Sequence, residues 1–421
     1  MKHLFKKIAV HGLARDSVIV FVGSMISNVG AYLYHLIIGR ILGPQGYGEL
    51  SSLISLLYIF GVPTIVLQTV LVKYFSNCKA KGSFSQARYL FHKMMVVLLA
   101  ILIPMIGLFA FCSPFIAEFL HLPGGRVVIW VYLSFFITTL TALSISVIQG
   151  FQLFIWYSVL TASGTILRVL ISIPFAYNGV EMTMIASFLT VTVFYMLYFL
   201  PLRFLFRSQE ESFPVSKRDF LKYSIPTFLT LLGMTSLYSM DIVLVKHYFS
   251  PYEAGIYSSV AVLGKVIFYA SAAIGTVLFP VISERFAKGK DTFSIIRLSV
   301  FLVTFASVGV TALYTVFPRV VVHFLFGTSY DGAASFLGLF AIFITFYSMV
   351  NIIVFSCLAL EKMHIYLFTC CASLLQIILI TIFHESLFHI IYINMGVTFA
   401  LLMGVGAYYW YGKNQHYHPN I

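Results

Sequence analysis

The stretch GRILGPQGYGELSSL at residues 39–53 and the stretch KHYFSPYEAGIYSSV at residues 246–260 decide the fold of this chain. Each is a break, rich in turn-forming residues, between two long apolar runs. An offset of 207 residues places Pro44, Gly48, Ser51 and Ser52 on Pro251, Gly255, Ser258 and Ser259. The same offset aligns the AKG triplet at 80–82 with the AKG triplet at 287–289. Apolar composition does not duplicate proline, glycine and lysine by chance, so the match predicts an internal repeat.

The repeat divides the chain at its longest hydrophilic segment, FRSQEESFPVSKRDF at 206–220. We therefore expect one helical bundle over 1–205, a cytoplasmic linker over 206–219 and a second bundle over 220–421. An even number of helices in each half keeps both halves in the same orientation. A pseudo-two-fold axis along the membrane normal should then relate the halves, with a substrate bound between them near the midplane.

The composition is that of a membrane protein. Of 421 residues, 60% are apolar and 10% are charged, and the mean hydropathy is +0.96, whereas a soluble domain carries about 25% charged residues. About 20 apolar residues span the hydrocarbon core, and continuous runs favour helices over the alternating strands of a barrel. The sequence predicts an all-α polytopic protein with about 12 transmembrane helices in two six-helix bundles. The runs are 17–40, 48–72, 89–112, 127–149, 153–177, 182–205, 220–247, 254–283, 295–317, 332–358, 363–383 and 386–411.

The net charge of +12 raises the question of a nucleic-acid partner. If the N-terminus is cytoplasmic, however, most of the 26 basic residues fall in cytoplasmic segments, and few fall on the other side. This asymmetry is the positive-inside pattern of a multi-pass protein. We expect the cytoplasmic membrane as the location, both termini in the cytoplasm, membrane lipids as partners and no nucleic acid.

The cysteines and histidines indicate neither a disulfide framework nor a metal site. The five cysteines show no paired metal-ligand spacing, so no metal and no cofactor are expected. His364, His384 and His389 lie near the ends of predicted helices, where interfacial anchoring is favoured over metal ligation. We find no segment with the features of a cleavable signal, because the first apolar run is long enough to span the membrane.

Three stretches of the chain resemble the multidrug/oligosaccharidyl-lipid/polysaccharide exporter superfamily, and within it the Wzx-like oligosaccharide flippases. They are RILGPQGYGELSSL at 40–53, SMDIVLVKHYFSPYEAGIYSSVAVLGK at 239–265 and VVHFLFGTSYDGAASFLGLFAI at 321–342. The resemblance implies a V-shaped pair of six-helix bundles that alternates between inward-open and outward-open states. Its implied substrate is a polyprenyl-diphosphate-linked oligosaccharide used for cell-surface polysaccharide, with glycan-assembly proteins as further partners. The first, second, seventh and eighth helices would line the cavity.

Two cations lie inside predicted spans, where an ionisable side chain is a functional candidate because its burial is costly. Arg168 shares a helix face with Ser158, Thr161, Thr165 and Ser172, and Lys265 lies in the middle of the eighth run. Either cation could contact the diphosphate of the substrate. A structural role in a salt bridge is an equal alternative. For the hydroxyl groups alone, helix packing and bonds to the helix backbone are favoured.

Five further residues are candidates. Asn28, Gln68 and Tyr58 lie on the implied lining helices and offer amide and aromatic groups to sugars. Asp241 is a candidate for binding a proton or a sodium ion, with His35 across the cleft as its partner, because a buried carboxylate favours neutralisation and histidine titrates near neutral pH. The alternative is a static bridge from Asp241 to Lys265 or Lys246, with His35 bonded to a carbonyl.

Three function classes remain at this stage. The favoured one is a flippase for lipid-linked glycans. The second is a cation-coupled exporter of small molecules from the related multidrug branch. The third is a membrane glycan polymerase or ligase, against which stand the short outer loops and the lack of a clustered acid/base pair or nucleophile motif. We therefore expect a transporter and not an enzyme.

Overall fold

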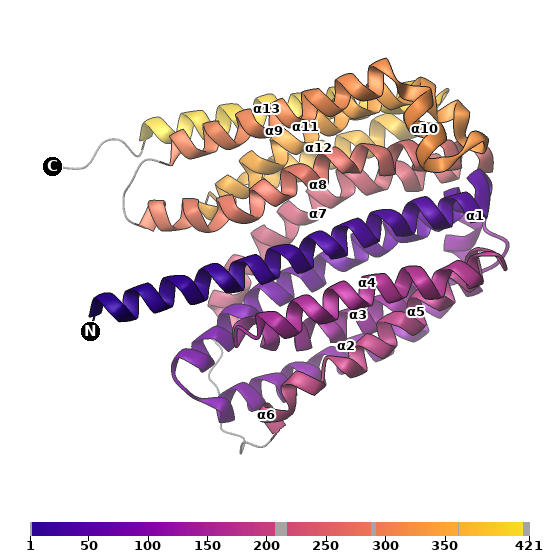
Figure 1. Ribbon diagram of the computed structural model, residues 1–421. Coiled ribbons are helices and arrows are strands. Elements are labelled where there is room, and N and C mark those ends of the chain that lie inside the picture. The colour runs from indigo at the N-terminus through magenta and orange to yellow at the C-terminus, as the bar shows by residue number, and fades with distance from the viewer. Residues whose placement is uncertain (1, 207–216, 288–291, 361, 416–421) are drawn as a thin grey trace. The chain divides into compact units, whose positions relative to one another are not determined.

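In the computed structural model the chain is helical over the residues that it describes (Figure 1), which are 2–206, 217–287, 292–360 and 362–415. Side chains are described for 19–206, 224–269, 282, 292–360 and 362–410. The α-helices are α1 (Lys2–Ala80), α2 (Phe84–Phe119), α3 (Arg126–Gly150), α4 (Phe154–Ala176), α5 (Val180–Leu197), α6 (Arg203–Phe206), α7 (Lys217–Tyr248), α8 (Pro251–Ala287), α9 (Phe293–Val316), α10 (Pro318–Phe326), α11 (Ala334–Ala359), α12 (Ile365–Ile382) and α13 (Leu387–Gln415). Two short 3₁₀ helices are η1 (Leu200–Leu202) and η2 (Thr328–Ala333).

The helices confirm an all-α polytopic membrane protein. Within the described residues, ten segments are long and apolar enough to cross a membrane, and the one in α1 has 62 residues, which is enough for two crossings. The 37-residue helix α8 adds another, although many of its side chains lie outside the described set. Each of the twelve predicted runs thus lies in a helical segment. The short helix α10 was not predicted from the sequence.

The two elbows break the chain in different ways. The first elbow ends a helix as expected, because Gly43, at φ 68° and ψ 177°, interrupts the helical backbone directly before Pro44, so that α1 consists of two helices joined at a kink. Proline disfavours helical backbone in the residue before it, and glycine accepts the positive φ. At the second elbow, the Ser250 hydroxyl accepts from the Glu253 amide and the Glu253 carboxylate accepts from the Ser250 amide. This capping box, with Pro251 in the first turn, starts α8.

The chain forms two compact units. Unit 1 contains residues 1–42 and 60–224, and unit 2 contains residues 43–59 and 225–421. The boundary after residue 224 lies close to the expected end of the linker at 219, although residues 207–216 of that linker lie outside the described residues. The first elbow and the start of the next span belong to unit 2.

The same helices recur in the two units in the same order. Helices α3, α4 and α5 of unit 1 correspond to α11, α12 and α13 of unit 2, close to the 207-residue offset. The long helix α2 corresponds to α9 followed by α10, which Pro318 separates. In unit 1, α3 packs against α2 and α5; in unit 2, α11 packs against α8, α9 and α13. The central helix of each unit is therefore a copy of the other.

Within unit 2, the first elbow packs directly on α8. A Cβ on Gly48 would lie 2.8 Å from the Gly255 nitrogen, and Gly255 lies against the carbonyl group of Pro44. Gly48 and Gly255 are equivalent in the repeat, as are Tyr58 and Lys265, whose ammonium lies 5.2 Å from the tyrosine ring centroid. Two such pairs, ten residues apart along the helix, show that the segment after the first elbow lies alongside α8 within unit 2.

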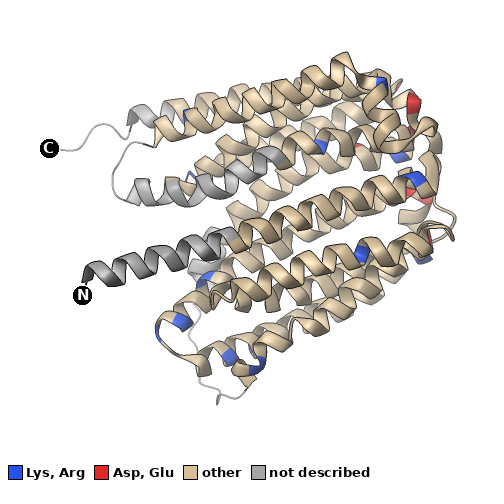
Figure 2. Cartoon of the chain, in the orientation of Figure 1, with Lys and Arg blue, Asp and Glu red and all other residues tan. Residues whose placement is uncertain are grey.

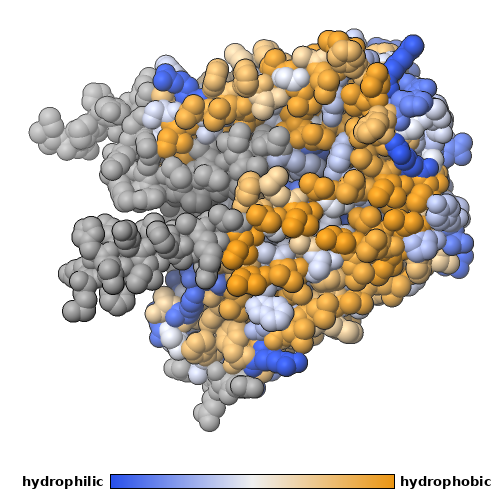
Figure 3. All heavy atoms as spheres, viewed as in Figure 1, coloured by the Kyte–Doolittle hydropathy of each residue, from blue (hydrophilic) through white to orange (hydrophobic). Residues whose placement is uncertain are grey.

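The outer surfaces fit a lipid environment. Figure 3 shows apolar side chains along the flanks of the helices and hydrophilic ones mainly toward the helix ends. In unit 1, basic residues gather at the end that holds α6 and the turn between α1 and α2 (Figure 2). The acidic residues Glu118 and Glu181 lie at the other end, where α2 finishes and α5 begins.

Candidate functional site

Arg168 of α4 forms the centre of a polar site in unit 1. Its guanidinium carbon lies 4.2 Å from the centroid of the Tyr34 ring, which is a cation–π contact. The Arg168 Nε donates to the Ser187 Oγ at 3.4 Å, and the Ser187 and Tyr34 hydroxyls lie 3.3 Å apart. Tyr34 is buried, whereas Arg168 is partly exposed. The site therefore holds its cation on one side by an aromatic face and leaves part of it accessible.

The hydroxyl groups that share the helix face of Arg168 serve packing. Thr161 donates to the Tyr157 carbonyl and Thr165 to the Thr161 carbonyl, both within α4. Ser158 and Thr165 face two glycines of α1, where an added Cβ would lie 2.6 Å from the Ser158 Cβ and 2.9 Å from the Thr165 Cγ2. The small residues thus bring α1 and α4 close together. The packing interpretation of these hydroxyls is confirmed.

Asp241 of α7 forms the centre of a buried polar network in unit 2. Its side chain is 1% exposed. The Tyr257 hydroxyl donates to the Asp241 Oδ2 at 2.6 Å, the Asn394 Nδ2 donates to the same oxygen at 3.1 Å, and the Ile242 amide donates to Oδ1 at 2.9 Å. Hydrogen bonds to a carboxylate are among the stronger ones in proteins. Three helices, α7, α8 and α13, therefore meet at this one side chain.

A second layer holds Asn394 in place. The Gln376 Nε2 of α12 donates to the Asn394 Oδ1 at 2.7 Å and to the Leu237 carbonyl at 2.9 Å. Gln376 and Asn394 are both fully buried. The Gln376 Oε1 has no hydrogen-bond partner among the described residues, so this network contains one unused hydrogen-bond acceptor. A buried network of oxygen atoms around a carboxylate can bind a proton or a small hard cation.

Lys265 lies between two tyrosine rings in unit 2. Its Nζ is 5.2 Å from the Tyr58 centroid and 5.1 Å from the Tyr238 centroid, and the side chain is 7% exposed. In the described part of the chain, Lys265 forms no direct ion pair with Asp241. The alternative of a static bridge from Asp241 to Lys265 is therefore wrong, and the aromatic faces are the direct partners of this cation.

The two polar sites occupy equivalent places in the repeat. Tyr34 and Ser187 of unit 1 correspond to Asp241 and Asn394 of unit 2 at the 207-residue offset, and each pair is joined by a hydrogen bond, at 3.3 Å and 3.1 Å. The geometry is therefore shared while the chemistry differs. Unit 1 combines this pair with a cation, and unit 2 supplies an anion at the same position.

The other predicted site residues differ from one another in burial and in their contacts. Gln68 donates to the Gln149 Oε1 at 3.1 Å within unit 1, so its amide is engaged by another side chain. Asn28 is exposed. His35 is partly buried, and its ring makes an edge contact with Tyr34, with centroids 5.6 Å apart. His35 belongs to unit 1 and Asp241 to unit 2, so their pairing stays a prediction.

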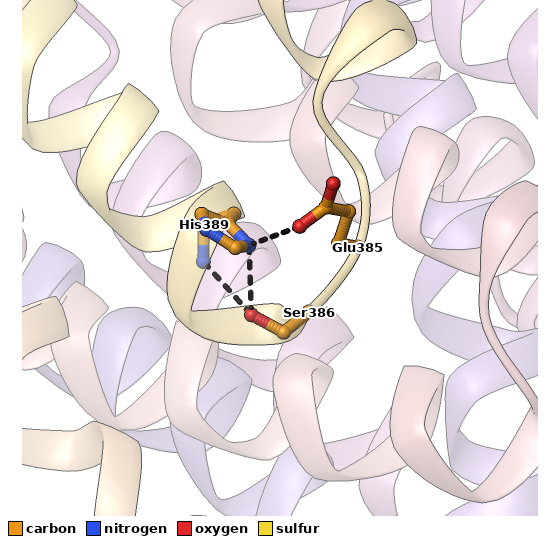
Figure 4. Close-up of polar contacts among 3 residues, drawn as sticks. All are labelled: Glu385, Ser386 and His389. Atoms are coloured by element: carbon orange, nitrogen blue, oxygen red, sulfur yellow. Dashed lines mark hydrogen bonds and ion pairs between the residues drawn. The ribbon is translucent and has the colours of Figure 1, made fainter.

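The histidines near helix ends take part in local contacts. The His389 Nδ1 lies 3.1 Å from the Ser386 Oγ and 3.9 Å from the Glu385 Oε2 (Figure 4). Ser386 also accepts from the His389 amide at 3.4 Å and so caps the start of α13. His384 stacks on Tyr248 with centroids 3.9 Å apart. Among the described residues, no three His, Cys, Asp or Glu side chains form a metal site.

Three members of these sites were not predicted from the sequence, namely Ser187, Gln376 and Asn394. A usable signal existed, because Gln376 and Asn394 are polar residues in long apolar runs. Once the contact between Tyr34 and Ser187 is known, the 207-residue offset predicts the equivalent contact between Asp241 and Asn394. The pairing of Arg168 with Tyr34 had no comparable signal, because it depends on how α1 and α4 pack.

Comparisons with known proteins agree with the fold. A family model described as polysaccharide biosynthesis protein matches residues 13–286. By sequence, no curated protein matches the chain. Among solved structures, an inward-facing MATE multidrug resistance transporter of the MOP superfamily aligns with a TM-score of 0.71 at 14% identity, covering 91% of this chain and 95% of that one. The lipid II flippase MurJ, in an inward closed conformation, aligns with a TM-score of 0.70 at 15% identity, covering 94% and 87%.

A third solved structure, the MATE multidrug transporter DinF-BH, aligns with a TM-score of 0.69 at 14% identity, covering 97% of this chain and 96% of that one. At such low identity these likenesses show a shared fold. They confirm the fold class expected from the apolar runs and the repeat.

Proposed function

Because the chain belongs to the polysaccharide biosynthesis protein family, we propose that it is a flippase for a polyprenyl-diphosphate-linked oligosaccharide. It moves this substrate across the cytoplasmic membrane by alternating access, with both termini in the cytoplasm and with glycan-assembly proteins as neighbours. The observation that carries the proposal is a cation on an aromatic face in each unit, Arg168 on Tyr34 and Lys265 between Tyr58 and Tyr238.

The two cations suit the diphosphate. Guanidinium and ammonium groups in a low-dielectric site bind phosphate oxygens strongly. Arg168 is partly exposed and has donors beyond its bond to Ser187, so it can receive a phosphate without losing its place. Lys265 is more buried, and we propose that it meets the substrate in a conformation in which the ring of Tyr58 moves aside.

The aromatic and amide groups suit the sugars. Tyr58 and Tyr238 present ring faces, and these can lie against the apolar face of a sugar ring. Gln68 is held by Gln149, so its remaining N–H is oriented for a sugar hydroxyl. Asn28 is exposed and can serve the same purpose. This combination of cations with aromatic and amide groups favours a glycan diphosphate over a purely apolar drug.

The Asp241 network supplies the energy coupling in this proposal. Alternating access needs an event that biases two conformations by a few kcal/mol. Uptake of a proton or a sodium ion by Asp241 changes the charge of a side chain that three helices share, α7, α8 and α13. His35 is proposed as a second member of a proton site.

Translocation in proteoliposomes tests the proposal. Purified variants are reconstituted, a fluorescent lipid-diphosphate oligosaccharide is loaded, and its appearance on the other leaflet is measured. Arg168→Ala and Lys265→Ala should each lower the rate at least tenfold, whereas Lys265→Arg should retain more than Lys265→Ala because it keeps the charge. Arg126→Ala removes an exposed arginine outside both sites and is the matched control. Normal rates for both alanine variants would contradict the role of the cations.

The same vesicles test the coupling and the second candidate function. Imposed proton and sodium gradients should accelerate the wild type, and Asp241→Asn should remove the response to the effective ion. Full gradient response in Asp241→Asn would exclude this site. A cation-coupled exporter of small molecules is favoured by the shared fold with multidrug transporters. Uptake of a small organic cation without any movement of the lipid-linked glycan would support that function instead.

A further inference from the structure

Two buried side chains hold the guanidinium of Arg168 in unit 1. Ser187 of α5 is 4% exposed and accepts a hydrogen bond from the Arg168 Nε at 3.4 Å. Tyr34 of α1 is 1% exposed, and its ring centroid lies 4.2 Å from the Arg168 guanidinium carbon. The Tyr34 and Ser187 hydroxyls lie 3.3 Å apart. Arg168 is therefore held at its inner nitrogen and on one face by two residues that also contact each other.

Close helix packing sets the positions of these side chains. A Cβ on Gly30 of α1 would lie 2.9 Å from the Thr165 Cγ2 of α4, so the two helices almost touch at this level. Tyr34 follows Gly30 by about one helical turn, and Arg168 follows Thr165 by about one turn. Helix α5 packs against α4 and supplies Ser187. Three packed helices, and no loop, therefore fix the surroundings of Arg168.

This arrangement leaves the outer end of the guanidinium available to a ligand. A guanidinium has five N–H donors, and the bond from Nε to Ser187 uses one of them. Among the described residues, Arg168 forms no other hydrogen bond and no ion pair. The remaining donors lie on Nη1 and Nη2, which form a planar fork that matches two oxygens of a phosphate. A ligand can therefore engage this fork while Ser187 keeps the Nε.

The equivalent residue of unit 2 has a comparable contact. Asn394 corresponds to Ser187 at the 207-residue offset and donates to the Asp241 Oδ2 at 3.1 Å. Asn394 is fully buried and is held in turn by Gln376. In both units, a buried side chain of the corresponding helices α5 and α13 thus bonds the charged residue of the polar site.

We propose that Ser187 and Tyr34 are positioning residues, which orient Arg168 so that its Nη1 and Nη2 bind the two non-bridging oxygens of one phosphate of the substrate. This inference rests on the proposed function, because it takes a lipid-linked diphosphate as the ligand. Each phosphate of such a diphosphate has two non-bridging oxygens, so one fork fits one phosphate. Arg168 then recognises the phosphate by geometry as well as by charge.

Translocation kinetics in proteoliposomes, measured over a range of substrate mole fractions, test the inference. Ser187→Ala should raise the KM for the lipid-linked glycan about tenfold and leave kcat within about twofold, because it loosens a group that binds the substrate throughout. Arg168→Lys keeps the charge and loses the fork, so it should raise KM at least as much. Ser163→Ala is the matched control, because its hydroxyl bonds only carbonyls within α4, and its KM should stay normal.

A double-mutant cycle separates positioning from a purely structural role. If Ser187 acts through Arg168, adding Ser187→Ala to Arg168→Ala should change KM by less than about twofold. A further rise of about tenfold in that background, or a normal KM in Ser187→Ala alone, would overturn the inference. Tyr34→Phe keeps the aromatic face and should have a lower KM than Tyr34→Leu. The reverse order would contradict the role of the ring.

A binding measurement distinguishes failure of this inference from failure of the proposed function. A wild type that moves no lipid-linked glycan would contradict the proposed function. Titration of inorganic pyrophosphate into the full-length protein in detergent, followed by calorimetry, repeats the same cycle without transport. Ser187→Ala should weaken pyrophosphate binding about tenfold in the presence of Arg168 and leave it unchanged in Arg168→Ala. Equal affinities of the wild type and Ser187→Ala would overturn the positioning role.

Discussion

Replacing Gly255 with alanine tests the contact between the first elbow and α8. Gly255 lies in the first turns of α8 and is buried against the backbone of the first elbow. A Cβ at this position would overlap the carbonyl group of Pro44 and would lie 2.7 Å from the Pro44 Cα. Optimal carbon–carbon contacts are about 3.5–4.0 Å, so the two segments would have to separate by about 1 Å or more.

The cost follows from what would have to move. Overpacking a tight contact typically costs about 1–3 kcal/mol, and here the opposing atoms are backbone atoms, which cannot rotate away. We therefore expect the upper end, about 3 kcal/mol. For a unit of roughly 200 residues this lowers the melting temperature by about 6–12 °C. Gly309 of α9 has no atom within 4 Å of an added Cβ, so Gly309→Ala should be neutral or slightly stabilising.

Thermal unfolding of both variants in the same detergent, followed by intrinsic fluorescence, measures the difference. Gly48→Ala should behave like Gly255→Ala but more mildly, because its nearest atom, the Gly255 nitrogen, is 2.8 Å away. If Gly255→Ala melts within about 1 °C of Gly309→Ala, the elbow does not pack on α8.

Three further predictions follow from the described contacts. Asn394→Leu should lower the free energy of unfolding by about 2–4 kcal/mol, because Asp241 and Gln376 lose a buried hydrogen-bond partner. Thermal unfolding measures this loss, with Met395→Leu as the control. Ser386→Ala should cost about 1 kcal/mol through loss of the cap on α13, whereas Ser163→Ala, which loses bonds only within α4, should be near neutral in the same assay. A cysteine at Gln45 should react with an impermeant maleimide from outside the cell and one at Lys81 only from the cytoplasm; labelling of both from one side would contradict the proposed orientation.

The elements were predictable because their causes are local. Apolar runs of membrane-spanning length are helical in lipid, since every backbone group must find a partner within the segment. The elbows were located by their prolines and glycines. The short helix α10 was missed although Pro318 and Gly327 mark its two ends, the latter with a φ of 92°. Its nine residues are too few for a span, so they were interpreted as part of a connection.

The partners within the sites were not predictable, because they depend on packing between distant segments. Arg168 was predicted to contact the diphosphate or to take part in a salt bridge, and the structure places the Tyr34 ring against it. Lys265 was considered for a bridge to Asp241 and lies between two tyrosines. Apolar patterns place a side chain on a helix face, but they do not say which neighbouring helix supplies its contact.

The repeat explains why the two units differ in charge at one shared place. Where equivalent residues touch each other, as Gly48 and Gly255 do, a larger side chain in either copy would clash, so both must stay small. Equivalent residues that do not touch each other can differ in chemistry. The pair Tyr34 and Ser187 of unit 1 is equivalent to the pair Asp241 and Asn394 of unit 2. In the proposed function, Asp241 of unit 2 binds the coupling cation, whereas Arg168 of unit 1 and Lys265 of unit 2 bind the anionic substrate. Because each ligand then stabilises its own set of conformations, the two can be coupled without sharing a single contact.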